Sequence, residues 1–318
     1  MPHWLTRTAV FFFAAALSAP LLAADAGTHV ELKAVPEYVS RLFVPVVAGQ
    51  ANTFRVETEP IDAIVEAPAN FTVALDNGGV VVNGPEDEAS GYARVRSGSR
   101  ELTLTLVNLI PSSEVHRGVL DGYRIGQYAA PLKGMPSYEA PKGFVRLTDD
   151  NAALMVSDHY RLSDFQCKLD GDSKFLILRT EALMKLEMLQ HELAQRGVNF
   201  ARFTIMSGFR TPYYNSRIGN ETGHSRHLYG DAMDIYIDEN HDGVMDDLTG
   251  DGRADAADAR AILRIAEELD QSPEWGWLQG GAGVYHANAA HGPYLHVDAR
   301  GYVARWGAVA GDGVLMAR

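Results

Sequence analysis

The sequence predicts an α+β protein in which a β-rich N-terminal domain precedes a mixed C-terminal domain. Three observations indicate this fold class. The first part of the chain alternates apolar and polar residues in short runs separated by turn residues, which is typical of strands. The second part contains two stretches with helical spacing of apolar residues, and shorter strand-like runs lie between and after them. Prolines gather where the first pattern gives way to the second.

Length and composition exclude several classes of protein. The chain has 318 residues, of which 46% are hydrophobic and 22% are charged, an ordinary globular composition. Its formal net charge of −13 provides no general electrostatic attraction to nucleic acid or anionic lipid. A single cysteine, Cys167, excludes both a disulfide framework and a metal site built from several thiolates. Metal ligands must therefore be histidine and carboxylate side chains.

The first residues have the composition of a secretory signal peptide. Arg7 is followed by the apolar run Ala9 to Leu17 and then by small residues. This run is shorter than the roughly 20 residues that a membrane-spanning helix needs. We expect cleavage close to Ala24, so that residues 1–24 are removed. The sequence thus predicts an exported protein, periplasmic or secreted, with no membrane span.

Residues 25–131 are expected to form a small β-sandwich-like domain. The alternating run Phe71 to Leu75 and the run Val80 to Val82 flank the turn Asn77-Gly78-Gly79. Asn-Gly and Gly-Gly steps tolerate the positive φ angles of tight hairpins. A second hairpin with the same pattern lies between Tyr92 and Leu106. The sequence indicates no role for this domain, because it contains no convergent cluster of reactive side chains.

Residues 132–145 are expected to be a linker, and residues 146–318 a second domain with helices and strands. The apolar residues of Glu181 to Arg196 and of Ala256 to Gln271 fall on one face of a helix each. Thr180 is expected to cap the first of these helices. Strand-like runs are expected at residues 202–206, 232–238, 283–285 and 294–298.

A histidine–carboxylate–histidine pattern lies on these strands. Asp234 faces away from the apolar side of its strand, an expensive position for a lone carboxylate. His227 precedes it across a turn at Gly230 and can fold back to meet it, and His296 occupies the corresponding face of the last strand. Two histidines and one carboxylate match a catalytic zinc site with an open fourth position for water. The alternative is two ordinary buried histidines beside a hydrogen-bonding aspartate.

Together these motifs resemble the zinc D-alanyl-D-alanine peptidase family. That family includes VanX-type dipeptidases and MepK-like murein endopeptidases, and hedgehog signalling domains share its fold. The resemblance covers about Arg161 to Trp306 and includes the glycine-rich strand Gly280 to Tyr285. The matching motifs are Ser207-Gly208-Phe209-Arg210, then Ser225-x-His227-x-x-Gly230-x-Ala232-x-Asp234, then Leu295-His296-Val297-Asp298.

The resemblance implies roles for individual residues. It implies a Zn²⁺ ion on His227, Asp234 and His296. It also implies that Arg210 binds the substrate carboxylate or stabilises the tetrahedral intermediate, and that Ser225 lines the peptide site. For Arg210 taken alone, a surface salt bridge is the alternative interpretation.

One position departs from the family pattern. Relatives often carry an acid three residues before the last zinc histidine, where it serves as the general base. Here that position is Pro293, which cannot titrate. The catalytic candidates that remain are His291, which we favour as the proton shuttle, and Asp298, which equally fits a role in orienting an imidazole.

Two consecutive acidic segments follow the Asp234 strand, in an acidic loop at 238–258, and have the spacing of a calcium-binding loop. Each places oxygen-bearing side chains at positions 1, 3, 5 and 9 and glycine at position 6. The sequence predicts a structural Ca²⁺ site here, and the alternative is an acidic, solvated loop. The expected calcium ligands are Asp238, Asn240, Asp242, Asp246, Asp247, Thr249, Asp251, Asp255 and Asp258.

These observations predict an exported zinc metallopeptidase that hydrolyses peptide bonds in peptidoglycan stem peptides or cross-links. Both carboxypeptidase and endopeptidase action, and both D,D and L,D specificity, stay open. The alternative from a different class is a non-catalytic module, stabilised by zinc or calcium, that binds cell wall or protein. The substrate class follows from the resemblance, whereas the metal site also follows from the residues themselves.

Overall fold

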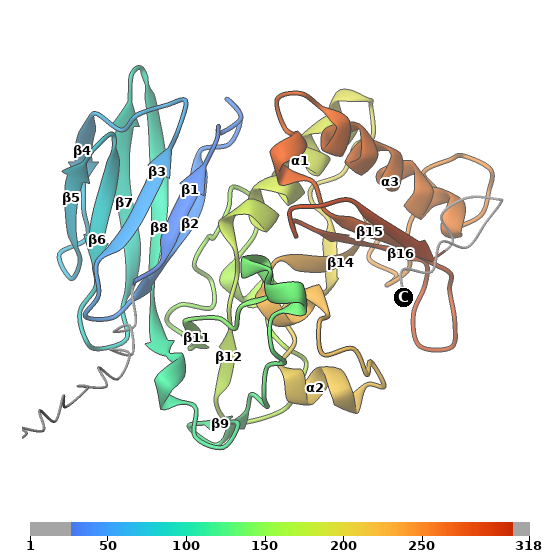
Figure 1. The fold of residues 1–318 in the computed structure, drawn as a ribbon. Coiled ribbons are helices and arrows are strands. Elements are labelled where there is room, and N and C mark those ends of the chain that lie inside the picture. The colour runs from blue at the N-terminus through green and yellow to red at the C-terminus, as the bar shows by residue number, and fades with distance from the viewer. Residues whose placement is uncertain (1–26, 308–318) are drawn as a thin grey trace, which may run out of the picture.

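The computed structural model describes residues 27–307 of the chain. The predicted signal peptide, residues 1–24, lies outside the described residues. The described part has the predicted α+β class, with strands in the first half and helices α1 (Thr180–Gln195), α2 (Pro212–Arg217) and α3 (Ala256–Gln271) in the second (Figure 1). None of the described helices is long and apolar enough to cross a membrane.

The N-terminal part contains two sheets (Figure 1). The first has the strand order β1-β3-β6-β5, and β2 of the second sheet contacts both β3 and β6. Asn77 and Gly78 adopt the positive φ angles expected of the first hairpin turn. The first sheet comprises β1 (His29–Leu32), β3 (Asn52–Val56), β6 (Gly79–Asn83) and β5 (Thr72–Asp76), and the second begins with β4 (Ala63–Glu66), β7 (Ser90–Ser97), β8 (Arg100–Pro111) and β2 (Arg41–Val47).

The second sheet continues beyond the N-terminal part. Strand β8 pairs with β11 (Gly143–Leu147), and β11 pairs with β12 (Lys174–Leu176), so backbone hydrogen bonds join the two predicted domains. The structure shows the α+β class. The β-sandwich class of the N-terminal part and the hedgehog-like class of the C-terminal part stay predictions. The shorter elements of the connecting region are β9 (Val119–Leu120), β10 (Tyr123–Arg124) and the 3-10 helices η1 (Ser112–Glu114), η2 (Leu132–Gly134), η3 (Pro136–Tyr138) and η4 (Leu162–Phe165).

One apolar core extends through both parts of the described chain. Helix α1 packs on β2 and α3, and the Thr180 hydroxyl at its start donates to the carbonyl oxygen of Phe43. The prediction that Thr180 caps this helix is wrong, because Arg179 occupies the N-cap position and Thr180 is already helical. The hydrogen bond from the Thr180 hydroxyl to the Phe43 carbonyl on β2 instead connects the start of α1 to the N-terminal part of the fold.

The C-terminal sheet positions the predicted site. Its strand order is β13-β14-β16-β15-β17, and helix α3 packs against β15 and β16. Alternation along β16 buries Leu295 and Val297 in the apolar core, so His296 faces the opposite side of the sheet. The strands are β13 (Thr204–Ser207), β14 (Ala232–Tyr236), β16 (Tyr294–Asp298), β15 (Gly281–Tyr285) and β17 (Ala304–Gly307), and the 3-10 helices are η5 (Arg226–Tyr229) and η6 (Gly276–Leu278).

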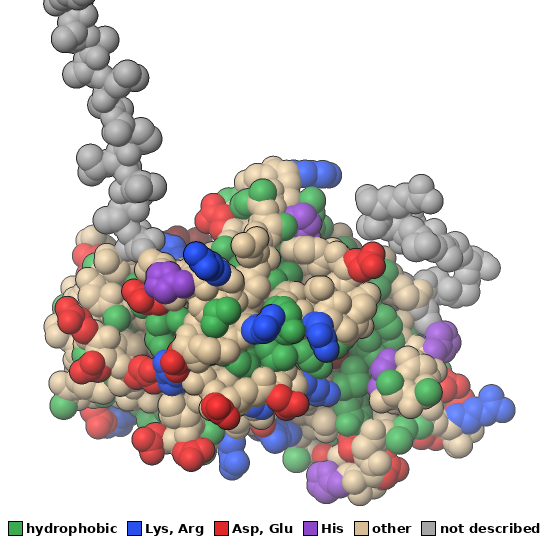
Figure 2. Space-filling view, turned by 90° about the horizontal axis from the view of Figure 1, so that it is seen from below, with side chains coloured by type: hydrophobic (Ala, Val, Ile, Leu, Met, Phe, Trp, Pro, Cys, Tyr) green, Lys and Arg blue, Asp and Glu red, His purple; other side chains and the backbone are tan. Residues whose placement is uncertain are grey.

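The surface shown in Figure 2 carries side chains of both charge signs. Acidic, basic and hydrophobic side chains lie among one another on this face. The net charge of −13 is therefore not concentrated there as one continuous acidic patch.

Candidate metal centre and cleft

Two of the three predicted metal ligands lie opposite each other on neighbouring strands. Asp234 on β14 is paired with His296 on β16 in antiparallel register. His227 comes from η5, and Gly230 turns the chain back into β14 with a φ of 73°. A Cβ atom at Gly230 would lie 2.3 Å from the carbonyl oxygen of Ile177. Glycine is needed at this turn for both its backbone angle and the space.

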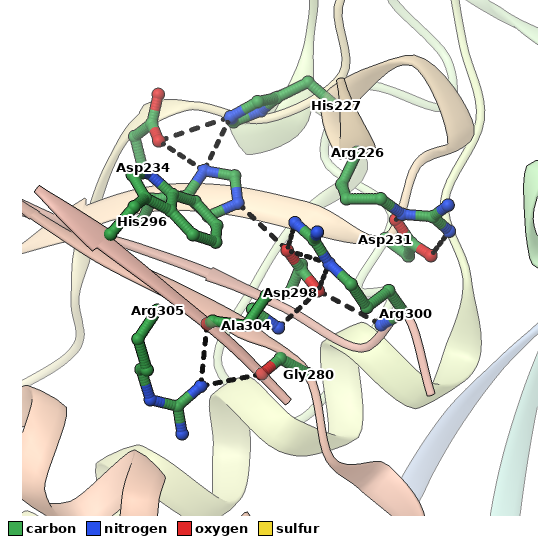
Figure 3. Close-up of polar contacts among 12 residues, drawn as sticks. Arg226, His227, Asp231, Asp234, Gly280, His296, Asp298, Arg300, Ala304 and Arg305 are labelled. Carbon is green, nitrogen blue, oxygen red and sulfur yellow. Dashed lines mark hydrogen bonds and ion pairs between the residues drawn. The ribbon is translucent and has the colours of Figure 1, made fainter. Parts of the chain in front are cut away.

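The three side chains lie close enough to share one metal ion. His227 Nε2 is 3.1 Å from His296 Nδ1 and 3.2 Å from Asp234 Oδ1, and His296 Nδ1 is 3.0 Å from the same oxygen (Figure 3). Ligand atoms at about 2.0 Å from a tetrahedral zinc ion are about 3.3 Å apart. All three residues are buried, and within the described residues they form the one such group that could hold a metal ion. The donor set therefore fits zinc.

The second nitrogen of each imidazole has its own partner. His227 Nδ1 lies 2.7 Å from the carbonyl oxygen of Gly208, and His296 Nε2 lies 3.2 Å from Asp298 Oδ2. A nitrogen that donates to an oxygen leaves the other ring nitrogen with its lone pair, which is the form that binds a metal. These partners therefore direct His227 Nε2 and His296 Nδ1 towards Asp234.

The charges of the group favour a bound cation. Burial lowers the pKa of His227 below its ordinary value, so its imidazole is neutral at physiological pH. Burial opposes ionisation of Asp234, but His227, His296 and Arg210 outweigh it and hold the pKa of Asp234 well below its usual range. Burial also opposes protonation of His296, yet Asp234 and Asp298 raise the pKa of that imidazole. Two carboxylates thus stabilise positive charge between them.

Arg210 lies beside this group, as predicted for a site residue. Its guanidinium Nε donates to Ser207 Oγ at 2.8 Å, and its Nη2 forms an ion pair with Asp234 Oδ2. Its backbone N–H donates to the carbonyl oxygen of His227 at 3.1 Å. Arg210 therefore contacts Oδ2 of Asp234, whereas both histidines face Oδ1 of the same carboxylate.

The ligands open into a cleft with a volume of about 460 Å³. Both Arg210 and the predicted peptide-site residue Ser225 line it. Asp234 is the one acidic residue among the described residues that line this cleft. The other lining residues are polar, basic or aromatic for the most part: Asn220, Thr222, His224, Arg226, Tyr285, Tyr294, Arg300, Ala304 and Trp306.

Sequence reasoning missed the aromatic residues of the cleft. Gly283 on β15 is in register with His296 on one side and with Trp306 of β17 on the other. The Trp306 ring lies 5.0 Å from the His296 ring, and a Cβ at Gly283 would lie 2.3 Å from the indole nitrogen. The glycine spacing in Gly280 to Tyr285 was the available signal, because glycine in a strand leaves room for a large neighbour.

The structure does not bring the two predicted proton carriers into the cleft. The His291 ring packs edge-on against Tyr294, with its Nδ1 2.7 Å from the Gly292 carbonyl oxygen and its Nε2 2.8 Å from Asn288 Nδ2. Asp298 is buried behind His296. A role in proton transfer stays a prediction for both residues.

The predicted calcium loop, residues 238–258, forms two consecutive turns. The carboxylates of Asp238, Asp247 and Asp258 accept backbone N–H groups of the loop. Within the described residues, its acids do not form a group that could hold a metal ion. Calcium binding stays a prediction. Asn240, Asp242, Asp246, Thr249 and Asp251 lie in the same loop, and Asp255 caps α3.

Comparison with known protein families adds an independent finding. The family model described as Peptidase M15 matches residues 158–291. The match includes Arg210, His227 and Asp234 and ends before His296. In the same comparisons, no curated protein and no solved structure matches the chain.

Proposed function

We propose that the C-terminal domain, which belongs to the M15 peptidase family of zinc D-alanyl-D-alanine peptidases, hydrolyses peptide bonds in peptidoglycan stem peptides or cross-links. One observation carries the enzymatic part of this proposal. His227, Asp234 and His296 direct three ligand atoms, 3.0 to 3.2 Å apart, towards one another beside an open cleft. Peptidoglycan as the substrate is supported by the resemblance to murein peptidases in the sequence motifs.

The residues at the site have distinct tasks in this reaction. Zinc bound by His227, Asp234 and His296 would polarise the scissile carbonyl and lower the pKa of a bound water towards about 7. Asp298 and the Gly208 carbonyl hold the two imidazoles in the orientation that ligation needs. Water is excluded from the ligands except on the side of the cleft, because all three side chains are buried.

Arg210 is the cleft arginine best placed to act on substrate. Arg226 is paired with Asp231 and Arg300 with Asp298, so both of these guanidinium groups are neutralised by acids that bind no metal. Arg210 is paired with the metal ligand Asp234. Because a bound cation would neutralise Asp234, the guanidinium of Arg210 would keep positive charge to bind a substrate carboxylate or the developing oxyanion.

A binding module without catalysis is the second candidate function. The observation that favours it is the absence of both predicted proton carriers, His291 and Asp298, from the described lining of the cleft. In that case the cleft would hold peptide without cleaving it, and the metal would stabilise the fold.

Muropeptide release distinguishes the two functions. We expect the zinc-loaded protein beginning at Asp25 to release muropeptides from purified peptidoglycan, as measured by liquid chromatography with mass spectrometry. Chelator treatment should stop the release, and added zinc should restore it. Binding to peptidoglycan without any release, with zinc bound and Arg210 intact, would support the binding module and contradict the enzyme. The masses of the products identify the bond that is cut.

Export is the remaining part of the proposal. The signal-peptide composition of residues 1–24 supports location in the periplasm or outside the cell. N-terminal sequencing of the protein recovered from the periplasmic fraction tests it. We expect the mature chain to begin close to Asp25, and recovery of the uncleaved chain in the cytosol would contradict export.

A further inference from the structure

We propose that Tyr285 is a further catalytic residue of this cleft. Its phenol O–H, fixed as a donor by the indole of Trp306, hydrogen-bonds the carbonyl oxygen on which negative charge develops during hydrolysis. This inference rests on the proposed peptidase function. It assigns a second hydrogen-bond donor for the oxyanion, carried by a different strand from the one that precedes Arg210.

The position of Tyr285 follows from the sheet register. Tyr285 lies on β15 directly opposite Tyr294 on β16, two residues along each strand from the pair Gly283 and His296. Side chains two residues apart on a strand share one face, so the phenol projects on the face that carries His296. The two tyrosine rings are stacked at 4.6 Å with an interplanar angle of 7°, and both line the metal cleft.

The hydrogen bond between Trp306 and Tyr285 determines the direction of the phenol hydrogen. Trp306 Nε1 donates to Tyr285 Oη at 2.8 Å. An indole N–H is a donor only, so the phenol oxygen must accept in this contact and its own hydrogen must point elsewhere. Among the described residues, no group accepts that hydrogen. Tyr285 therefore has a donor available to a ligand in the cleft.

The indole that fixes Tyr285 is itself held firmly. Gly283 provides the space beneath it, since a Cβ there would lie 2.3 Å from Trp306 Nε1. The indole also lies 5.0 Å from the His296 ring, and the Arg300 guanidinium covers it at 5.2 Å. A donor that is oriented before substrate binds loses little energy to reorganisation during the reaction.

The surroundings of Tyr285 keep its phenol neutral. Burial raises the pKa of Tyr285 above its ordinary value and the charge of Asp234 adds to this, whereas the Trp306 hydrogen bond and Arg210 act in the opposite direction. The phenol therefore keeps its proton at neutral pH and remains a donor.

The chemical step requires nothing of Tyr285 except this hydrogen bond. The water oxygen forms a bond to the carbonyl carbon, and the π electrons of the C=O bond move to the carbonyl oxygen. The C–N bond then breaks as the C=O bond re-forms, and the leaving nitrogen takes up a proton derived from the water. Tyr285 keeps its own proton throughout, so the step needs no further reactant.

The first test removes the hydroxyl alone. Tyr285→Phe keeps the ring stacked on Tyr294, so we expect an unchanged melting temperature and zinc content. We expect kcat for muropeptide release to fall about 100-fold, as for loss of other oxyanion donors, with KM changed by less than about 3-fold. Tyr302→Phe is the matched control because Tyr302 hydrogen-bonds Tyr138 and does not line the cleft. A loss of less than about 3-fold in Tyr285→Phe would overturn the inference.

The second test does not depend on turnover. The probe is a phosphinic analogue of D-Ala-D-Ala, in which a tetrahedral P(O)OH–CH₂ unit replaces the peptide bond, and its affinity for the zinc-loaded protein is measured by calorimetry beside that of D-Ala-D-Ala. We expect Tyr285→Phe to weaken phosphinate binding at least 10-fold and dipeptide binding by less than about 3-fold. Trp306→Phe removes the indole N–H that donates to Tyr285 but keeps the phenol. This variant should lose less phosphinate affinity than Tyr285→Phe.

The outcomes separate this inference from the proposed function. A wild-type protein that binds the phosphinate tightly but releases no muropeptides contradicts the proposed function, and the Tyr285→Phe affinity still decides the role of the phenol. Equal losses of phosphinate and dipeptide affinity would overturn the inference, because the phenol would then serve binding alone. A wild-type protein with no preference for the phosphinate would overturn it as well.

Discussion

Asp298 lies directly behind His296, with its Oδ2 atom 3.2 Å from His296 Nε2. The carboxylate is itself held by the Arg300 guanidinium (Figure 3) and by the backbone N–H of Gly281 at 2.8 Å. The buried ammonium of Lys185 donates to the backbone carbonyl of the same aspartate at 3.2 Å. The imidazole that faces the metal site is therefore oriented by a carboxylate with little freedom to move.

The substitution Asp298→Asn tests this relationship. The amide has nearly the same shape but lacks the charge that polarises the imidazole, and it removes the ion pair with Arg300. We expect zinc affinity to fall about 10- to 100-fold, which competition with a chromophoric chelator measures. Asp62→Asn, at an exposed surface ion pair, is the control and should leave zinc affinity unchanged. Unchanged affinity in Asp298→Asn would contradict the orienting role.

Removal of a ligand gives a stronger prediction. His227→Ala leaves one imidazole and one carboxylate, so we expect zinc to be lost and muropeptide release to stop. The N-terminal sheets should remain folded, because His227 is not part of the apolar core that holds them. Metal analysis, muropeptide profiles and far-ultraviolet circular dichroism measure these effects, with the exposed His29→Ala as control. Hydrolysis retained in His227→Ala would refute the ligand assignment.

The substitution His291→Ala tests the predicted proton shuttle. Removing a general base typically lowers the rate by about 10² to 10⁴-fold. Both ring nitrogens of His291 contact Asn288 or Gly292, and the ring does not line the cleft, so we expect kcat to fall less than about 10-fold. His224→Ala, which removes a histidine that does line the cleft, provides the comparison. A loss above 100-fold in His291→Ala alone would establish His291 as the proton carrier.

A pH effect on stability is expected from His159. The hydrogen bond with Glu187, at 2.6 Å, raises the pKa of His159 above its ordinary value, so the protonated imidazole favours the folded state. This contribution is fully present below the ordinary pKa of 6.5 and is lost as the pH rises through the higher folded-state pKa. The melting temperature of the wild type should therefore fall more between about pH 6 and pH 8.5 than that of His159→Gln. Parallel curves for the two proteins would contradict this coupling.

The predicted Ca²⁺ site in the acidic loop, residues 238–258, is tested by the melting temperature of the protein. Calcium that binds the folded loop at 100 times its dissociation constant would stabilise the protein by about 2.7 kcal/mol. We expect Ca²⁺ to raise the melting temperature of the zinc-loaded protein, and the double substitution Asp242→Ala with Asp251→Ala to remove the effect. Asp149→Ala with Asp150→Ala, two exposed acids outside the loop, is the control. An unchanged melting temperature across a calcium titration would exclude the site at those concentrations.

Several features of this protein follow from the sequence because they depend on neighbouring residues. The spacing of apolar residues predicts helix α3 at Ala256–Gln271 as the structure has it, and predicts α1 to within one residue at each end. Alternation along β14 and β16 predicts that Asp234 and His296 leave the apolar core, and the family motifs identify His227 as their partner. Local periodicity and local motifs carry this information.

Other features depend on the tertiary structure, since they require residues far apart in the chain to meet. Strand β11 joins the two predicted domains, because it pairs with β8 on one side and with β12 on the other. The Phe43 carbonyl accepts the Thr180 hydroxyl that the sequence assigns to a helix cap. Trp306 reaches Tyr285 only because β17 aligns beside Gly283 of β15. His291 does not line the cleft, and its two ring nitrogens contact Asn288 and Gly292 instead. Periodicity determines which face a side chain takes, whereas strand register and packing determine what it meets there.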